Sequence, residues 1–202
     1  MRVVIYPHFF MALQPYSFVT VADMKSMLDI SETTWDSILE DLIDQCTKWC
    51  ENYCGGRRFL QSGSDVTEYY DGKDSCKIFL KNYPIISITS VSYRSGFYDN
   101  PDWIAFNPSY EYLRDDVKGI LHMAAMPRGI QNIKVVYKGG YSSAANVPDD
   151  LHLAVRKMVA KEFNRRKSQG ILQESLGGSS VTWNENLDPF VSSLLDNYKN
   201  FV

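Results

Sequence analysis

Residues 132–166 read NIKVVYKGGYSSAANVPDDLHLAVRKMVAKEFNRR, and this stretch decides the fold. Alternating apolar and polar residues at Ile133–Tyr137 predict a strand. The strand should stop at Gly139-Gly140, because glycine tolerates backbone angles that other residues avoid. Pro148 suits the first position of the helix that follows, and Asp149-Asp150 lie where the helix dipole favours negative charge. The residues of this connection therefore have a structural role, and none of them resembles a catalytic nucleophile, a metal-binding motif or a phosphate-binding loop.

The helix predicted over 148–167 is amphipathic. Its apolar residues, from Leu151 to Phe163, recur at helical spacing and should face the core. The other face is basic, because residues 156–167 hold six cations against one anion, Glu162. The cations are Arg156, Lys157, Lys161, Arg165, Arg166 and Lys167.

A second amphipathic helix is predicted over 31–54, after a short helix over 21–28 that Thr20 can cap. Gly55-Gly56 supplies the C-terminal stop of the longer helix. One stripe of this helix is apolar and is predicted to face the core. The stripe comprises Trp35, Ile38, Leu39, Leu42, Ile43, Cys46, Trp49, Cys50 and Tyr53.

The opposite face of the 31–54 helix is acidic. Asp36, Glu40 and Asp44 are among its carboxylates, and Lys48 is its one cation. Such a face is either solvated or meets a basic neighbour. Both interpretations remain open from the sequence.

Four cysteines occur, at positions 46, 50, 54 and 76. The first three are spaced four apart on one predicted helix, where they are poorly placed for disulfides with each other. We interpret them as reduced thiols packed in the core. A zinc site is the alternative, but CxxC-type spacing is absent and the three histidines lie far apart in the sequence. We therefore expect no metal and no cofactor.

Between residues 61 and 138 the period of the sequence changes to two, which predicts antiparallel strands. Val66–Tyr70 and Lys77–Leu80 are predicted to form one hairpin, and Tyr110–Arg114 and Gly119–His122 another. The β-branched run 85–93 predicts a further strand. The loop 94–109 carries Trp103 and Phe106, which either form a contact surface or pin the loop onto the sheet.

These patterns predict an α+β fold with four parts. Residues 1–17 form an arm rather than an export signal, since Pro7-His8 interrupt the apolar run and no convincing cleavage site follows. Residues 18–60 and 139–167 form a helical core, and 61–138 an inserted β-subdomain. Residues 168–202 form a flexible linker and a C-terminal segment, in which Asp188 caps a last helix that docks on its own chain or on a partner.

Composition narrows the function classes. The 202 residues carry a net charge of −3, which gives no general attraction for nucleic acid or anionic membrane. No uninterrupted run approaches the ~20 apolar residues of a membrane span. Common catalytic motifs are absent, and the pairs Asp115-Asp116 and Asp149-Asp150 have structural reasons to lie in a turn and at a helix start. We expect no enzyme; DNA binding through the cations of the 148–167 helix is a weaker alternative.

In their order along the chain, these segments resemble the head–tail connector proteins of long-tailed bacteriophages, also called adaptor or head-completion proteins. The segments are the helices over 21–28 and 31–54, Cys50–Phe59, Tyr83–Ile88, Val136–Tyr141, Val147–Leu151 and Glu174–Gly178. The resemblance covers residues 18–198. Ser31-Glu32 departs from the paired aspartates common at that helix start, and the N-terminal arm and the loop around Trp103 look like additions.

The resemblance implies a structural virion protein of the head–tail neck. During assembly the protein would be in the host cytoplasm. It implies a homo-oligomeric ring, typically of twelve copies, beneath the portal protein. The ring would extend the DNA channel, let genomic DNA pass without sequence-specific binding, and carry the stopper or tail-completion protein. No membrane is involved. A stopper or tail-completion protein is the alternative identity.

Two sets of contact residues follow as hypotheses. A closed ring needs two different patches on each subunit, and the acidic and basic helices would supply them, unless these helices pair within one subunit. The proposed ring contacts are Asp36, Glu40, Asp44, Arg156, Lys161 and Arg165. By position, the C-terminal segment inherits contact with the portal through Leu187, Phe190, Leu194, Leu195, Tyr198 and Phe201.

Overall fold

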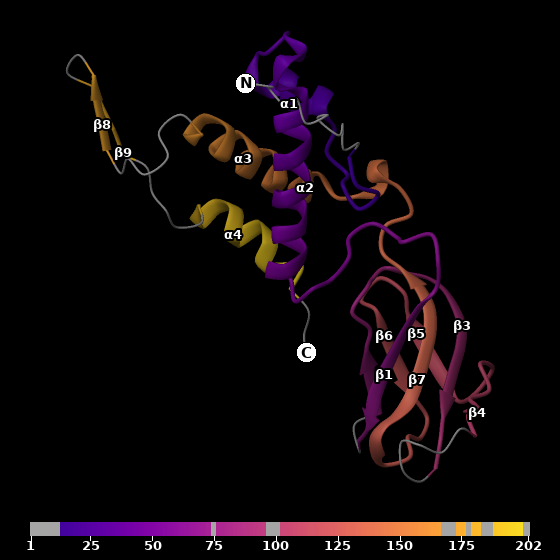
Figure 1. Ribbon diagram of the computed structural model, residues 1–202. Helices are drawn as coiled ribbons and strands as arrows, with labels where there is room; N and C mark the ends of the chain where they lie inside the picture. The colour runs from indigo at the N-terminus through magenta and orange to yellow at the C-terminus, as the bar shows by residue number, and fades with distance from the viewer. Residues whose placement is uncertain are drawn as a thin grey trace, which may run out of the picture.

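The computed structural model describes residues 13–73, 76–95, 102–166, 173–176, 179–182 and 188–199. The fold is α+β, as predicted. The helices pack together in one body, and the antiparallel strands form another. The chain passes from the helices to the strands and back again through connecting segments (Figure 1).

The helical body is built from α1 (Val21–Leu28), α2 (Asp36–Tyr53), α3 (Asp149–Arg165) and α4 (Pro189–Asp196). α2 packs on α3, α3 on α4, and α1 on both α2 and α3. Their apolar faces share one hydrophobic core. Thr20 caps α1 through a capping box with Asp23, as its sequence predicts.

Both long helices begin later than predicted. The 31–54 helix starts at Asp36, because Thr33–Trp35 form a separate 3-10 turn (η1), a frequent form of helix entry. The 148–167 helix starts at Asp149, with Pro148 in an extended conformation at the cap position. Lys167 lies outside the described residues.

The strand body contains two antiparallel sheets. β1 (Val66–Gly72), β7 (Gly129–Gly139), β3 (Ile85–Tyr93) and β4 (Ile104–Ala105) form one sheet in that order. The second sheet has the order β2 (Lys77–Phe79), β6 (Ile120–Met123) and β5 (Tyr112–Asp115). Side chains from both sheets meet in a second hydrophobic core, separate from that of the helices.

One of the two predicted hairpins is wrong. β1 pairs with β7, with Val66 opposite Tyr137, and β2 pairs with β6. The two strands flank a turn-forming sequence, but each finds its partner far along the chain. The other hairpin, β5–β6, is confirmed, with Tyr112 opposite Met123.

The join between β7 and α3 is the structural turn that the sequence predicts. Gly140 has φ +105°, and a Cβ at this position would lie 2.8 Å from the Phe59 carbonyl oxygen. The backbone N–H of Tyr141 donates to that same oxygen at 2.6 Å. The two connections between helices and strands therefore run against each other here, and only glycine fits.

Two further segments differ in how they are held. In the loop before β5, Phe106 is buried against Tyr93, and Trp103 contacts Tyr69 and the cations of Arg94 and Lys134. These contacts favour the interpretation that aromatic residues pin the loop. In the predicted linker, β8 (Gln173–Leu176) and β9 (Ser179–Thr182) form a hairpin that stands away from α3 and α4 (Figure 1).

Candidate assembly surfaces on the helical body

The acidic face predicted for α2 is partly buried. Asp44 is 9% exposed and accepts hydrogen bonds from the Gln14 backbone N–H at 3.1 Å and the Ser17 hydroxyl at 2.5 Å. Glu51 is fully buried, accepts from the Phe59 N–H at 3.2 Å and pairs with Lys48 at 3.0 Å. Buried carboxylates need such partners. Asp44 is therefore not available to a neighbouring subunit, contrary to the prediction.

The remaining predicted acidic contacts lie at the surface. Asp36 is half-buried and forms an ion pair with Lys25 of α1, with 2.8 Å between Nζ and Oδ1. Glu40 is half-buried, and the neighbouring Asp41 is exposed. The outward carboxylates thus gather in the first half of α2.

Part of the apolar stripe of α2 faces outward, although the whole stripe is predicted to face the core. Leu39, Ile43, Cys46 and Cys50 are buried, whereas Ile38 is 37% and Trp49 40% exposed. At about 100° per residue, Ile38 and Trp49 lie roughly 90° around the helix from Leu39. The stripe is wider than one core contact can cover.

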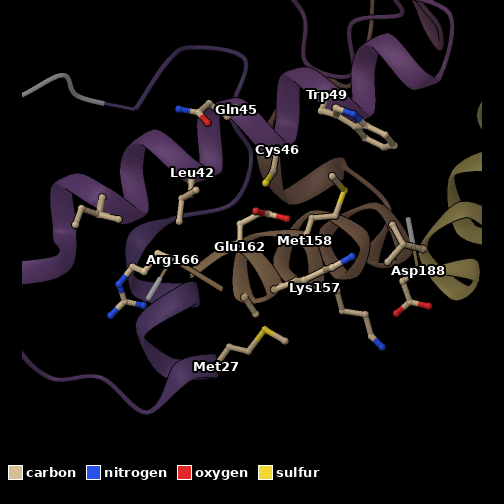
Figure 2. Close-up of a pocket in the computed structure, with 14 residues that line it drawn as sticks. Met27, Leu42, Gln45, Cys46, Trp49, Lys157, Met158, Glu162, Arg166 and Asp188 are labelled. Atoms are coloured by element: carbon tan, nitrogen blue, oxygen red, sulfur yellow. The ribbon is translucent and has the colours of Figure 1, made fainter. Parts of the chain in front are cut away.

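The outward flank of α2 borders a groove of about 820 Å³ between α2, α3 and the start of α4. Figure 2 shows Leu42, Cys46 and Trp49 on one side, with Met158 and Lys157 facing them from α3. Met27 of α1 closes the lower edge. We call this feature the apolar groove; it is lined by Met27, Ile38, Leu42, Gln45, Cys46, Trp49, Lys157, Met158, Ala160, Lys161, Glu162, Arg166, Asp188 and Val191.

The basic helix α3 packs on the acidic helix α2 within one chain. The contact is made by apolar faces: the Cys50 thiol lies 3.5 Å from the Met158 sulfur. The charged residues lie on the flanks. Arg156, Lys161 and Arg165 are half-buried, and the Arg156 Nε donates to the His152 carbonyl at 3.3 Å. The two helices therefore pair within one subunit, the alternative that the sequence left open, and they do so through their apolar faces.

α4 is docked on its own chain. Leu195 is fully buried, Val191 nearly so, and Leu194 packs against the same core. The Tyr198 hydroxyl donates to both oxygens of Asp150, at 2.7 and 2.8 Å. Of the predicted portal contacts, Phe190 is exposed. Leu194, Leu195 and Tyr198 contact other residues of their own chain. Leu187 and Phe201 lie outside the described residues.

A buried arginine links the two bodies, and sequence reasoning missed it. Arg57 is 1% exposed; it donates to the Tyr83 carbonyl at 2.5 Å and the Tyr198 carbonyl at 3.4 Å, and its guanidinium lies 3.3 Å from the Tyr83 ring centre. Burial lowers the pKa of Arg57. The sequence around Arg57 does not indicate that this residue is buried, because its hydrogen-bond partners lie 26 and 141 residues away.

The helical cysteines are core residues. Cys46, Cys50 and Cys54 are buried free thiols, and burial raises the pKa of Cys46 to about 12 and of Cys54 to about 11. Their thiolates are thus suppressed at neutral pH. Within the described ranges, no three His, Cys, Asp or Glu side chains are grouped as a metal would need.

The carboxylate pairs considered as acid/base candidates have structural partners. Asp115 ends β5 and accepts from the Lys118 N–H at 3.1 Å, within the β5–β6 turn. Asp149 and Asp150 form the first turn of α3, where Asp150 holds Tyr198. No described helix is long and apolar enough to cross a membrane.

Comparison with known proteins assigns the chain to a family. The family model for head completion proteins matches residues 17–201, so the chain belongs to the head completion protein family. A comparison with curated proteins found no match.

Solved structures share the fold. One is described as the neck of a native gene transfer agent (GTA) particle computed with C12 symmetry; it is 14% identical, with TM-score 0.57, and the match covers 95% of this chain and 94% of that one. The neck of an empty GTA particle computed with C6 symmetry matches at 14% identity and TM-score 0.58, over the same shares. A chain from a native GTA virion matches at 13% identity and TM-score 0.59, again over the same shares. The chain is a structural protein of the head–tail connector class.

Proposed function

We propose that the chain forms a closed ring beneath a portal protein, extends the channel for genomic DNA and offers a platform to a stopper or tail-completion protein. The observation that carries this is the family match over residues 17–201, together with a fold shared with neck structures computed with C12 and C6 symmetry. Twelve copies is the expected number. Assembly would draw on subunits in the host cytoplasm, and the finished ring would belong to the virion.

Ring contacts in this proposal join the outward carboxylates of α2 to the cations of α3 in the adjacent copy. A cyclic interface is heterologous, so each subunit must present two different patches. Asp36 and Glu40 form the acidic patch, and Arg156, Lys161 and Arg165 the basic one. Asp44 leaves the set because it is buried in its own chain.

We assign the proposed contacts to parts of the chain according to the two hydrophobic cores. We assign the ring contacts to the helical core, 18–60 and 139–167, and treat 61–138 as an inserted β-subdomain. The C-terminal segment, 168–202, contacts the portal. Phe190 is the described residue best placed for this, because it is exposed on α4, the helix that follows the β8–β9 segment in the chain.

The test is assembly with the portal. Purified chain is mixed with isolated portal rings, and the mass of the complex is measured by multi-angle light scattering. The expected result is a complex that gains about twelve copies and weakens in Glu40→Lys at low salt, where surface charge pairs are least screened. Asp102→Lys, an equal charge reversal at an exposed position of the strand body, is the matched control. Absence of any portal complex, or binding to tail tube alone, would reject the adaptor role.

A further inference from the structure

The apolar groove presents side chains that soluble proteins usually cover. Met27, Ile38 and Trp49 are exposed along it, and half-buried Leu42 and Met158 form its floor. These apolar residues share one concave surface with charged side chains, mostly of α3, and they mark a binding site for a largely apolar segment. Methionine at two of these positions suits a site that must adapt to its ligand.

A second, shallower depression leads from this groove to the point where the chain enters the described structure. It is lined by Gln14 and Tyr16 together with Asp44, Lys48 and other residues of α2, and it shares Gln45 and Trp49 with the apolar groove. Asp44 holds the Gln14 backbone N–H at 3.1 Å. The described chain thus begins beside the groove, and Trp49 lines both depressions.

The N-terminal segment has the composition of a groove ligand. Residues 1–12 read MRVVIYPHFFMA, with apolar clusters at Val3–Ile5 and Phe9–Met11 and no acidic residue. Pro7 breaks a helix and favours an extended chain before it. Twelve extended residues reach about 40 Å, against about 27 Å for the length of α2. The family match begins at residue 17, so this arm lies outside the shared family sequence.

We propose that residues 1–12 of the chain dock in the apolar groove of the same molecule, with their two apolar clusters against Ile38, Trp49 and Met158. The same molecule is favoured over a second copy because the anchor at Gln14 holds the arm beside the groove at high effective concentration. The inference concerns the free chain and does not depend on the ring.

A photo-crosslinker tests the contact directly. p-Benzoylphenylalanine replaces Phe9 in the full chain, the sample is irradiated at low micromolar concentration, and products are separated by size and mapped by mass spectrometry. The expected products are monomeric, with links to groove residues of α2 and α3. The matched control places the same probe at Tyr110, 73% exposed on the strand body, and should give no groove links. Links confined to dimers, links elsewhere, or none would overturn the proposal.

Proteolysis gives a second, independent measurement. Chymotrypsin cleavage after Phe9 and Phe10 should become at least fivefold faster in Ile38→Glu/Trp49→Glu than in the unaltered chain. Trp49 also stacks on Tyr53, so circular dichroism first establishes that the variant is folded at the temperature of the cleavage assay. Tyr69→Glu/Leu113→Glu, which alters exposed apolar residues of the strand body, should leave cleavage unchanged. An unaltered rate in the groove variant would overturn the proposal. Neither measurement uses the portal, so a failed ring assay leaves this result intact.

Discussion

Asp44 shows at the residue scale how a charged side chain on a helix can serve its own chain. Replacing it with Ala leaves the Gln14 N–H and the Ser17 hydroxyl without their acceptor. A buried polar group left unpaired costs about 1–3 kcal/mol, so Asp44→Ala should lower the free energy of unfolding by about that amount. Urea denaturation followed by circular dichroism measures it. Asp41→Ala, exposed on the same helix, should change stability by less than about 0.5 kcal/mol; equal losses would refute the account.

The same residue marks the limit of prediction from sequence at this scale. Residue types and spacing correctly placed Leu39, Ile43 and Cys50 in the core. They could not show that the segment around Gln14 covers the flank of Asp44, or that the other described residues leave Trp49 40% exposed. A helical pattern records which residues are apolar, but which flank is covered depends on segments distant in the sequence.

At the scale of elements, local signals predicted well. The Thr20 cap, the β5–β6 hairpin and the Asp188 cap of α4 are all confirmed, because each depends on residues within a few positions. The β1–β2 hairpin failed since the partner of Val66 is Tyr137, 71 positions away. Strand order therefore required the whole chain.

The α1 cap gives a prediction about pH. The Thr20 hydroxyl donates to the Asp23 carboxylate at 2.7 Å and lowers the pKa of Asp23 below its ordinary value of 3.8. A depressed folded-state pKa contributes stability above the unfolded pKa and loses it as pH falls through the folded value. Thr20→Ala should destabilise the chain by about 1 kcal/mol near neutral pH. The difference between variant and parent should shrink below pH 4, as measured by urea titrations at several pH values; a constant difference would contradict the role of Asp23.

The β7–α3 join gives a prediction about backbone geometry. Gly140→Ala must place a Cβ at φ +105° and 2.8 Å from the Phe59 carbonyl oxygen. Strain of this kind costs about 1–3 kcal/mol, and displacement of the Phe59 backbone adds to it. Gly63→Ala is the matched control, because it also has positive φ but open space around its Cβ. Thermal unfolding should show a larger loss for Gly140→Ala; equal losses would mean that the close approach is unimportant.

At the scale of the whole molecule, Arg57 ties the helical body, the strand body and the end of α4 to one another. Its guanidinium joins the Tyr83 and Tyr198 carbonyls, which belong to different parts of the chain. Arg57→Lys keeps the charge but loses the planar fork that reaches both oxygens. We expect a loss of about 2–4 kcal/mol in the free energy of unfolding, because two part-buried carbonyls lose their charged donor.

Hydrogen exchange distinguishes local loosening of α4 from destabilisation of the whole helical body. In Arg57→Lys, amides of α4 from Val191 to Leu195 should exchange at least tenfold faster, since the Tyr198 end is released from the strand body while the α2–α3 core stays closed. Arg58→Lys is the matched control. Arg58 bonds Asn82 through its backbone N–H, which the substitution keeps, so α4 should stay protected. Uniform acceleration across α2, α3 and α4 would mean that Arg57 stabilises the fold as a whole. Faster exchange confined to α4 would identify Arg57 as the residue that holds the end of α4 against the strand body.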